Sequence, residues 1–173
     1  MKNNDMNSIT DFELIDDFWG IFDGLGHSLS NLIIKSQKRH IGLFGVSEEG
    51  VTVRNLGLGS TCRIEYIEGS NNNTRKKQRN TYEDSYKEES VHIGSVVGLC
   101  RSSESNPCIV ENVISGAEVV VTGRNTVKGP SVGGISGTCT GDCTLRNVVY
   151  TGKTLTTTNR VGVVGIAVGG ITG

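Results

Sequence analysis

An eight-residue pattern with asparagine in its fifth position occurs four times in this chain of 173 residues. Apolar residues alternate before the asparagine and alternate again after it on a shifted phase. The copies cover residues 27–34, 51–58, 108–115 and 143–150, and their asparagines are Asn31, Asn55, Asn112 and Asn147. Repetition at intervals of a few tens of residues is typical of repeat architectures. This pattern therefore constrains the fold more than any other feature of the sequence.

Each copy is interpreted as two short strands that meet at a corner. Alternation with a period of two predicts a strand with one buried face, as in Val51 and Val53. The shift of phase at the asparagine predicts a bend that keeps both strands on one core, with Leu56 and Leu58 buried after it. Asparagine tolerates left-handed backbone geometry, and stacked amides can form hydrogen-bonded ladders. We expect the four asparagines to form such a ladder.

A second repeated element, an apolar residue followed by glycine, precedes each later copy and occurs once more after the last. Its glycines are Gly42, Gly94, Gly133 and Gly162. Glycine inside a strand usually marks a bend or a close approach of two backbones. The chain is glycine-rich, with 24 glycines, and the intervals fit coils of about 25–30 residues, some with an inserted loop. The sequence thus predicts an all-β fold, a right-handed parallel β-helix (solenoid) of about four coils.

One solenoid domain is expected over residues 12–173, after a polar segment at residues 1–11. Residues 68–90 are polar and charged, which predicts a solvated, flexible inserted loop; a basic docking patch at its Lys and Arg residues is the alternative. The repeats begin almost at once and stop in mid-pattern. We therefore expect a fragment of a longer protein, so the lack of a visible signal peptide carries little weight.

Charge and hydropathy exclude some classes of partner. The net charge is −1, which gives no electrostatic reason to expect nucleic acid as a ligand. The longest apolar run, at residues 161–171, is too short and too rich in glycine to span a bilayer. We expect neither a nucleic-acid partner nor a membrane span within this chain.

Four cysteines occupy matched places in two successive coils. Cys108 and Cys143 start their copies of the pattern, and Cys100 and Cys139 each follow a coil's closing glycine by two residues. Pairing Cys100 with Cys108 and Cys139 with Cys143 would clip each turn, whereas pairing Cys100 with Cys139 and Cys108 with Cys143 would staple neighbouring coils. Strands about 4.8 Å apart lie within disulfide reach, but we favour the clips because they tolerate changes in loop length. Cysteine pairs favour an oxidising, extracytoplasmic setting, and Cys62 is expected to be a buried thiol.

No catalytic constellation is evident, and we expect no cofactor. The cysteine spacings lack the usual pattern of zinc ligands, so no metal is expected. The three histidines, His27, His40 and His92, are interpreted as structural. Asp16, Asp17 and Asp23 lie near Trp19 and could imitate a carboxylate pair with a sugar-stacking aromatic ring, although a polar entry turn is the simpler interpretation.

The stretch from Phe18 to Leu32 reads FWGIFDGLGHSLSNL, and residues 41–45 with 53–56 continue it as a next coil. It resembles the entry segment of GLUG-motif β-helix proteins, of the form F-x-G-x-F-D-G-x-G-H-x-I-x-N-L. The resemblance is specific from Phe18 to Leu58 and looser towards Gly173, where cysteines and the charged loop depart from it. It implies a large cell-surface or secreted protein, often adhesin-like.

These observations favour a non-enzymatic structural or adhesive β-helix segment of a cell-surface or secreted protein. Its partners would be host or cell-surface glycans or proteins. The alternative is a carbohydrate-active or carbohydrate-binding β-helix that uses Asp16, Asp17 or Asp23.

Overall fold

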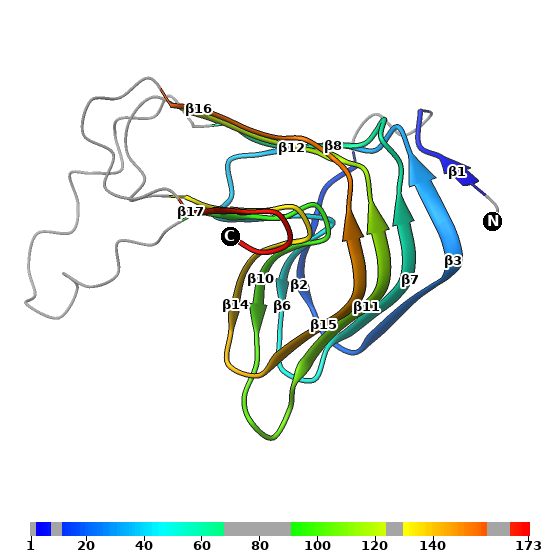
Figure 1. The fold of residues 1–173 in the computed structure, drawn as a ribbon, viewed down its shortest axis with the longest axis vertical. Helices are drawn as coiled ribbons and strands as arrows, with labels where there is room; N and C mark the ends of the chain where they lie inside the picture. The colour runs from blue at the N-terminus through cyan, green and yellow to red at the C-terminus, as the bar shows by residue number, and fades with distance from the viewer. Residues whose placement is uncertain (1–2, 8–11, 68–90, 124–129, 159–166) are drawn as a thin grey trace, which may run out of the picture.

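The chain is all-β in its computed structural model, which describes residues 3–7, 12–67, 91–123, 130–158 and 167–173. Within these ranges the strands form four parallel sheets and no helix is present. Figure 1 shows strands that are far apart in the sequence lying side by side in each sheet.

The four sheets, labelled A to D, contain the seventeen strands found in the described residues. Sheet A is built from β1 (Asn3–Asp5), β3 (Ile21–Ser30), β7 (Thr52–Leu58), β11 (Cys108–Ser115) and β15 (Cys143–Tyr150). Sheet B is built from β2 (Ile15–Phe18), β6 (Phe44–Ser47), β10 (Val97–Arg101) and β14 (Ser136–Thr140). Sheet C is built from β4 (Ile33–Ser36), β8 (Arg63–Ile67), β12 (Glu118–Gly123) and β16 (Thr154–Thr158). Sheet D is built from β5 (His40–Ile41), β9 (His92–Ile93), β13 (Ser131–Gly133) and β17 (Ala167–Gly169).

From β2 onwards the chain visits the sheets in the order B, A, C, D, and it completes this order four times. We call each round a pass: β2–β5, β6–β9, β10–β13 and β14–β17. Neighbours within a sheet are equivalent strands of successive passes, so Val53 lies beside Val110 and Val110 beside Leu145. Within the polar N-terminal segment, β1 pairs with Ser28–Ser30 at the edge of sheet A.

The burial of sheet A follows the alternation and the phase shift that the sequence predicts. In β7, Val53 is buried before Asn55, and Leu56 and Leu58 are buried after it. The same shift places Val110 and Val113 of β11 in the core. A change of phase at the bend keeps both halves of the strand packed on one apolar interior.

Glycines mark the places where backbones of successive passes come close. A Cβ atom on Gly94 would lie 2.5 Å from the Ile135 carbonyl oxygen, and one on Gly42 would lie 2.9 Å from the Val96 carbonyl oxygen. Gly133 is equally confined, with the Gly173 backbone nitrogen 2.8 Å from its Cβ position. These contacts leave no room for a side chain. Gly162, the fourth glycine of this element, and the charged loop at 68–90 lie outside the described residues.

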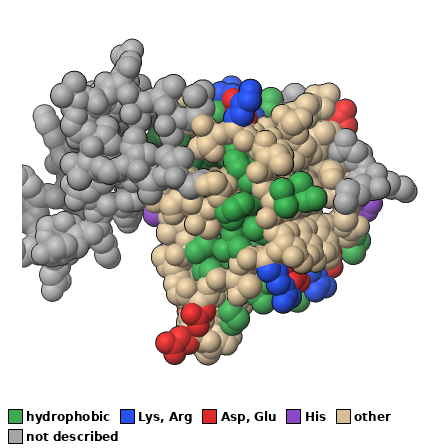
Figure 2. Space-filling view, viewed as in Figure 1, with side chains coloured by type: hydrophobic (Ala, Val, Ile, Leu, Met, Phe, Trp, Pro, Cys, Tyr) green, Lys and Arg blue, Asp and Glu red, His purple; other side chains and the backbone are tan. Residues whose placement is uncertain are grey.

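The fourth pass presents apolar side chains that are only partly covered. Leu145 and Val148 of β15 are partly buried, whereas Val110 and Val113 at the same positions of β11 are 1% and 0% exposed. Figure 2 shows hydrophobic side chains gathered on this face of the molecule. The third pass therefore has a complete apolar environment that the fourth pass lacks on its outer side.

Candidate functional site

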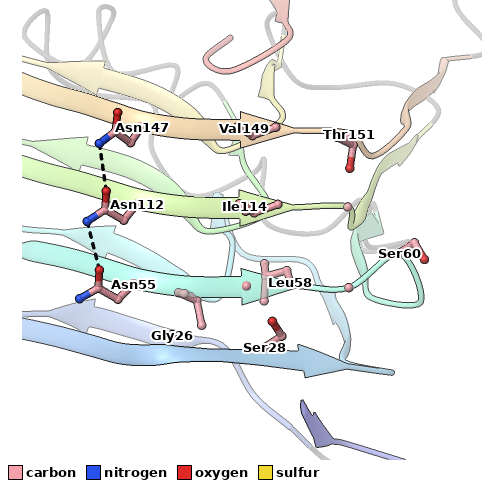
Figure 3. A pocket seen from close by; sticks show the side chains of 14 residues that line it. Gly26, Ser28, Asn55, Leu58, Ser60, Asn112, Ile114, Asn147, Val149 and Thr151 are labelled. Carbon is pink, nitrogen blue, oxygen red and sulfur yellow. Dashed lines mark hydrogen bonds between the residues drawn. The ribbon is translucent and has the colours of Figure 1, made fainter. Parts of the chain in front are cut away.

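The corner of sheet A is held by a ladder of asparagine amides. Asn55, Asn112 and Asn147 have φ values of 54°, 53° and 51°, in the left-handed region that asparagine tolerates better than most residues. Asn147 Nδ2 donates to Asn112 Oδ1 at 3.1 Å, and Asn112 Nδ2 donates to Asn55 Oδ1 at 3.1 Å. Figure 3 shows the three amides stacked on successive strands.

Asn31 is not part of this ladder, which corrects the sequence alignment. Its φ is also positive, at 58°, but it lies at the next corner, between β3 and β4. Its backbone N–H donates to Thr61 Oγ1 at 2.9 Å, and its Nδ2 donates to Asp5 Oδ1 at 2.8 Å. In the first pass the ladder corner contains Gly24, Leu25 and Gly26, where the register of β3 against β7 shifts between Asp23 and His27. The first copy of the sequence pattern therefore marks the corner between β3 and β4, which is the next corner along the chain after the one that carries the ladder.

Asp23 ends the ladder in the first pass. Its Oδ1 accepts hydrogen bonds from Asn55 Nδ2 and from the Leu25 backbone N–H, both at 2.9 Å, and its Oδ2 accepts one from Arg54 Nε at 2.9 Å. The bond from Asn55, with smaller contributions from Leu25 and Arg54, holds the pKa of Asp23 below its ordinary value. A carboxylate bound in this way stays ionised and is poorly suited to act as a general acid.

Alternating charges flank the ladder on the outer face of sheet A. Asp23, Arg54, Glu111 and Arg146 lie side by side on successive strands. Arg54 pairs with Asp23, and Arg146 pairs with Glu111. Opposite charges at directly facing positions stabilise a sheet modestly, and this row forms a polar margin beside the bend.

Beyond the ladder, the outer surface of sheet A is hollowed into a groove of about 930 Å3. Its floor is the row Gly57, Ile114 and Val149, which are lateral neighbours on β7, β11 and β15. Ile114 and Val149 are 52% and 48% exposed. The asparagine ladder forms one side of the groove, and Figure 3 shows the labelled lining residues on adjacent strands.

The far margin of the groove carries hydroxyl groups. Ser60 and Thr151 line it after the ends of β7 and β15, whereas Ser28 of β3 lies beside Gly57 at the end of the floor row. The site therefore combines an exposed aliphatic floor with amide and hydroxyl groups at its margins. These residues were not predicted from the sequence, because the alternation of apolar residues reports only what faces the core. The one available signal was aliphatic Ile114 and Val149 at outward positions where polar residues are usual.

The other acidic candidates lie elsewhere. Asp16 and Asp17 are exposed on β2 of sheet B, and Asp16 pairs with Lys38 at 3.0 Å. Trp19 follows β2 and is 68% exposed. Asp16 therefore has a cation as its partner, and Asp23 belongs to the ladder.

The structure holds all five cysteines as free thiols, so neither predicted set of disulfides is present. Cys100 lies beside Cys139 across sheet B, and Cys108 lies beside Cys143 across sheet A. The Cys100 thiol lies 3.6 Å from Ser136 Oγ, and the neighbouring thiols raise its pKa well above the ordinary value. Cys62 is buried apart from them, and burial raises the pKa of its thiol.

The histidines of sheet D are stacked. The rings of His40 and His92 are 5.2 Å apart and nearly parallel, and His92 Nδ1 lies 2.6 Å from Thr138 Oγ1. Burial lowers the pKa of His92 to about 4 and also lowers that of His40. His27 lies apart from them, beside Leu56 across sheet A.

Among the described residues, no group of three or more His, Cys, Asp and Glu side chains is arranged to hold a metal ion. The same part of the chain contains no helix long and apolar enough to cross a bilayer. Comparison with protein-family models, with curated proteins and with solved structures finds no match.

Proposed function

We propose that the chain is a segment of a right-handed parallel β-helix that serves as a structural or adhesive surface of a cell-surface or secreted protein. Four passes in register through the same parallel sheets support this proposal, because successive coils of a solenoid stack in this way. The resemblance of residues 18–58 to GLUG-motif proteins adds the expectation of an extracellular setting.

The groove of sheet A is the observation that carries the adhesive part of the proposal. Ile114 and Val149 expose neighbouring aliphatic surface at positions where a polar side chain would not destabilise the fold. Contiguous exposed apolar surface with a polar margin is typical of binding sites. Asn112 and Asn147 offer amide groups beside it. A glycan or an extended peptide of a host or cell surface, with an apolar face and polar edges, fits this arrangement.

A double variant of the groove tests the proposal. Ile114→Glu with Val149→Glu changes only half-exposed side chains, so the fold should be retained. Ile33→Glu is the matched control, because Ile33 is 54% exposed on sheet C. We expect the double variant to lose binding to arrayed glycans or to cultured cells, while the control binds as the wild type does. Equal binding by all three proteins would remove the groove from the proposal.

A carbohydrate-active β-helix is the second candidate function. The exposed Trp19 ring favours it, since aromatic rings stack on sugars, whereas the hydrogen bonds and ion pair of Asp23 oppose a catalytic role for that carboxylate. The two candidates are separated by assaying polysaccharide turnover together with binding. Binding without turnover supports the adhesive function, and turnover that Asp23→Asn abolishes would replace it with the enzymatic one.

A further inference from the structure

Two stacked turns bring four cysteines to one place in the structure. In the third pass, Cys100 lies near the end of β10 and Cys108 begins β11; in the fourth, Cys139 and Cys143 hold the same positions in β14 and β15. The register places Cys100 beside Cys139 and Cys108 beside Cys143. The result is a cluster of four thiols, which the proposed adhesive function does not use.

The four thiols differ in their access to solvent. Cys100 and Cys108 are 0% and 1% exposed, whereas Cys139 and Cys143 are only partly buried. The residues between the last two, 140–142, are exposed. A reagent in solution can therefore reach Cys139 and Cys143 but not the other pair.

The surroundings of the accessible pair lower the pKa of both thiols. Ser102 Oγ lies 3.3 Å from Cys143 Sγ, and the Cys139 thiol donates to Ser136 Oγ at 3.5 Å. The neighbouring Cys100 thiol is the largest cause of the lowered pKa values of Cys139 and Cys143, and the pKa of Cys143 falls to about 6. The pKa of Cys100 is raised well above its ordinary value, so it remains a protonated donor. Cys143 is thus largely a thiolate at neutral pH, and the thiolate is the nucleophilic form.

We propose that Cys139 and Cys143 form a thiol–disulfide exchange site for small-molecule disulfides of the glutathione class. The Cys143 thiolate attacks one sulfur of the disulfide, whose S–S bond breaks and releases one thiolate. The Cys139 thiol then loses its proton to solvent and attacks Cys143 Sγ, which expels the second thiolate. The two cysteines are oxidised to one disulfide, and the small disulfide is reduced to two thiols that take up the released protons.

Mass mapping identifies the pair that forms. Trypsin cuts the chain so that Cys139 and Cys143 share the peptide 129–146, while Cys100, Cys108 and Cys62 lie in the peptides 88–101, 102–124 and 55–63. The reduced protein is exposed to oxidised glutathione at neutral pH, its remaining thiols are alkylated in denaturant, and it is digested. We expect peptide 129–146 to lose two hydrogens and carry no label, while the other three peptides are labelled. A cross-link between peptides, or label on both cysteines of 129–146, would overturn the proposal.

Single variants assign the order of the steps. Cys139→Ser should accumulate a mixed disulfide between glutathione and Cys143, whereas Cys143→Ser should form much less mixed disulfide, because the attacking thiolate is absent. Cys62→Ser is the matched control and should react as the wild type does. Before oxidation, the alkylation rate of Cys143 should reach half its maximum near pH 6 rather than near the value of about 8.5 for an ordinary thiol. If the alkylation rate of Cys143 instead follows the pH dependence of an ordinary thiol, in protein that circular dichroism shows to be folded, the activation of Cys143 is contradicted.

Discussion

At the scale of single residues, the corner of sheet A requires a residue that tolerates a left-handed backbone conformation. Its side chain must also form hydrogen bonds with the equivalent residues of the neighbouring strands. Asn112 does both, since its φ is 53° and its amide donates to Asn55 and accepts from Asn147. Glycine would satisfy the first requirement and not the second. Alanine would satisfy neither.

This difference predicts the effects of two substitutions. Asn112→Ala should destabilise the protein by about 1–2 kcal/mol, because two exposed hydrogen bonds are lost and a Cβ-bearing residue remains in the left-handed region. Asn112→Gly should cost less, about 0.5–1 kcal/mol, because only the amide contacts are lost. Urea unfolding measures both. An unchanged midpoint for Asn112→Ala would show that the ladder contributes nothing to stability.

Gly98 shows how closely the passes approach one another. A Cβ atom there would lie 2.4 Å from the Ile41 backbone nitrogen and 2.6 Å from the Gly45 carbonyl oxygen. Both are backbone atoms that cannot turn aside. Gly98→Ala should therefore destabilise the fold by about 1–3 kcal/mol in thermal or chemical unfolding. Gly170→Ala is the control, because no atom lies within 4 Å of its Cβ position, and an equal loss in both variants would refute the steric explanation.

At the scale of elements, sheet D consists of strands two or three residues long, and two of them place histidine rings against each other. His40 Nδ1 is buried without a hydrogen-bond partner among the described residues, and His92 shares a hydrogen bond with Thr138. Two protonated rings at a separation of 5.2 Å would repel each other in a partly buried setting. The sheet therefore favours neutral histidines.

The pH dependence of stability follows from these histidines. The pKa of His92 is about 4 in the folded protein and near 6.5 when unfolded, so the unfolded chain binds more protons between these values. Stability should be fully present above about pH 6.5 and fall as the pH is lowered towards 4. The shift would be worth about 3 kcal/mol in full, but the ring is partly exposed, so we expect a loss of about 1–2 kcal/mol. Thermal melts across this range measure the loss.

The control for the pH series is His92→Gln, whose side chain can still bond to Thr138 but does not titrate. Its melting temperature should fall less steeply between pH 6.5 and 4 than that of the wild type. Equal slopes would assign the acid sensitivity to other groups.

At the scale of the whole molecule, the sequence predicted the repetition better than the details of each pass. The alternation around Asn55, Asn112 and Asn147 located three equivalent strands of sheet A, and the parallel register agrees with it. The first pass was misplaced because Leu25, with a φ of 52° and followed by Gly26, forms the corner without asparagine. A left-handed corner can be built by more than one residue type, so residue identity alone did not fix the alignment.

The site was less predictable than the fold, for two physical reasons. The groove depends on the outward side of sheet A, whereas the alternation of apolar residues identifies only the side that faces the core, so Ile114 and Val149 were not recognised as part of a site. The proximity of the four cysteines followed from their matched positions. Whether they form disulfides depends on an oxidant, which no sequence pattern contains.

Equivalent passes predict that one of them can be removed. Val97 and Ser136 lie beside each other in sheet B. Deletion of residues 97–135 would therefore join Val96 directly to Ser136, the first residue of β14 in the fourth pass. The shortened chain should keep its parallel sheets, because the fourth pass can stack on the second. Its denaturant m-value should fall by roughly a quarter, in proportion to the surface lost on removing one of four passes.

The control deletes residues 110–148, a segment of equal length whose ends do not correspond. It would join Ile109 to Val149, although Ile109 corresponds to Thr144, so that the corner at Asn147 is lost from the joined strand. We expect the control to unfold or aggregate and the matched deletion to give a β-sheet circular dichroism spectrum with one cooperative transition. If both variants fail alike, the passes depend on one another too closely to act as separate units, and the solenoid interpretation loses its main support.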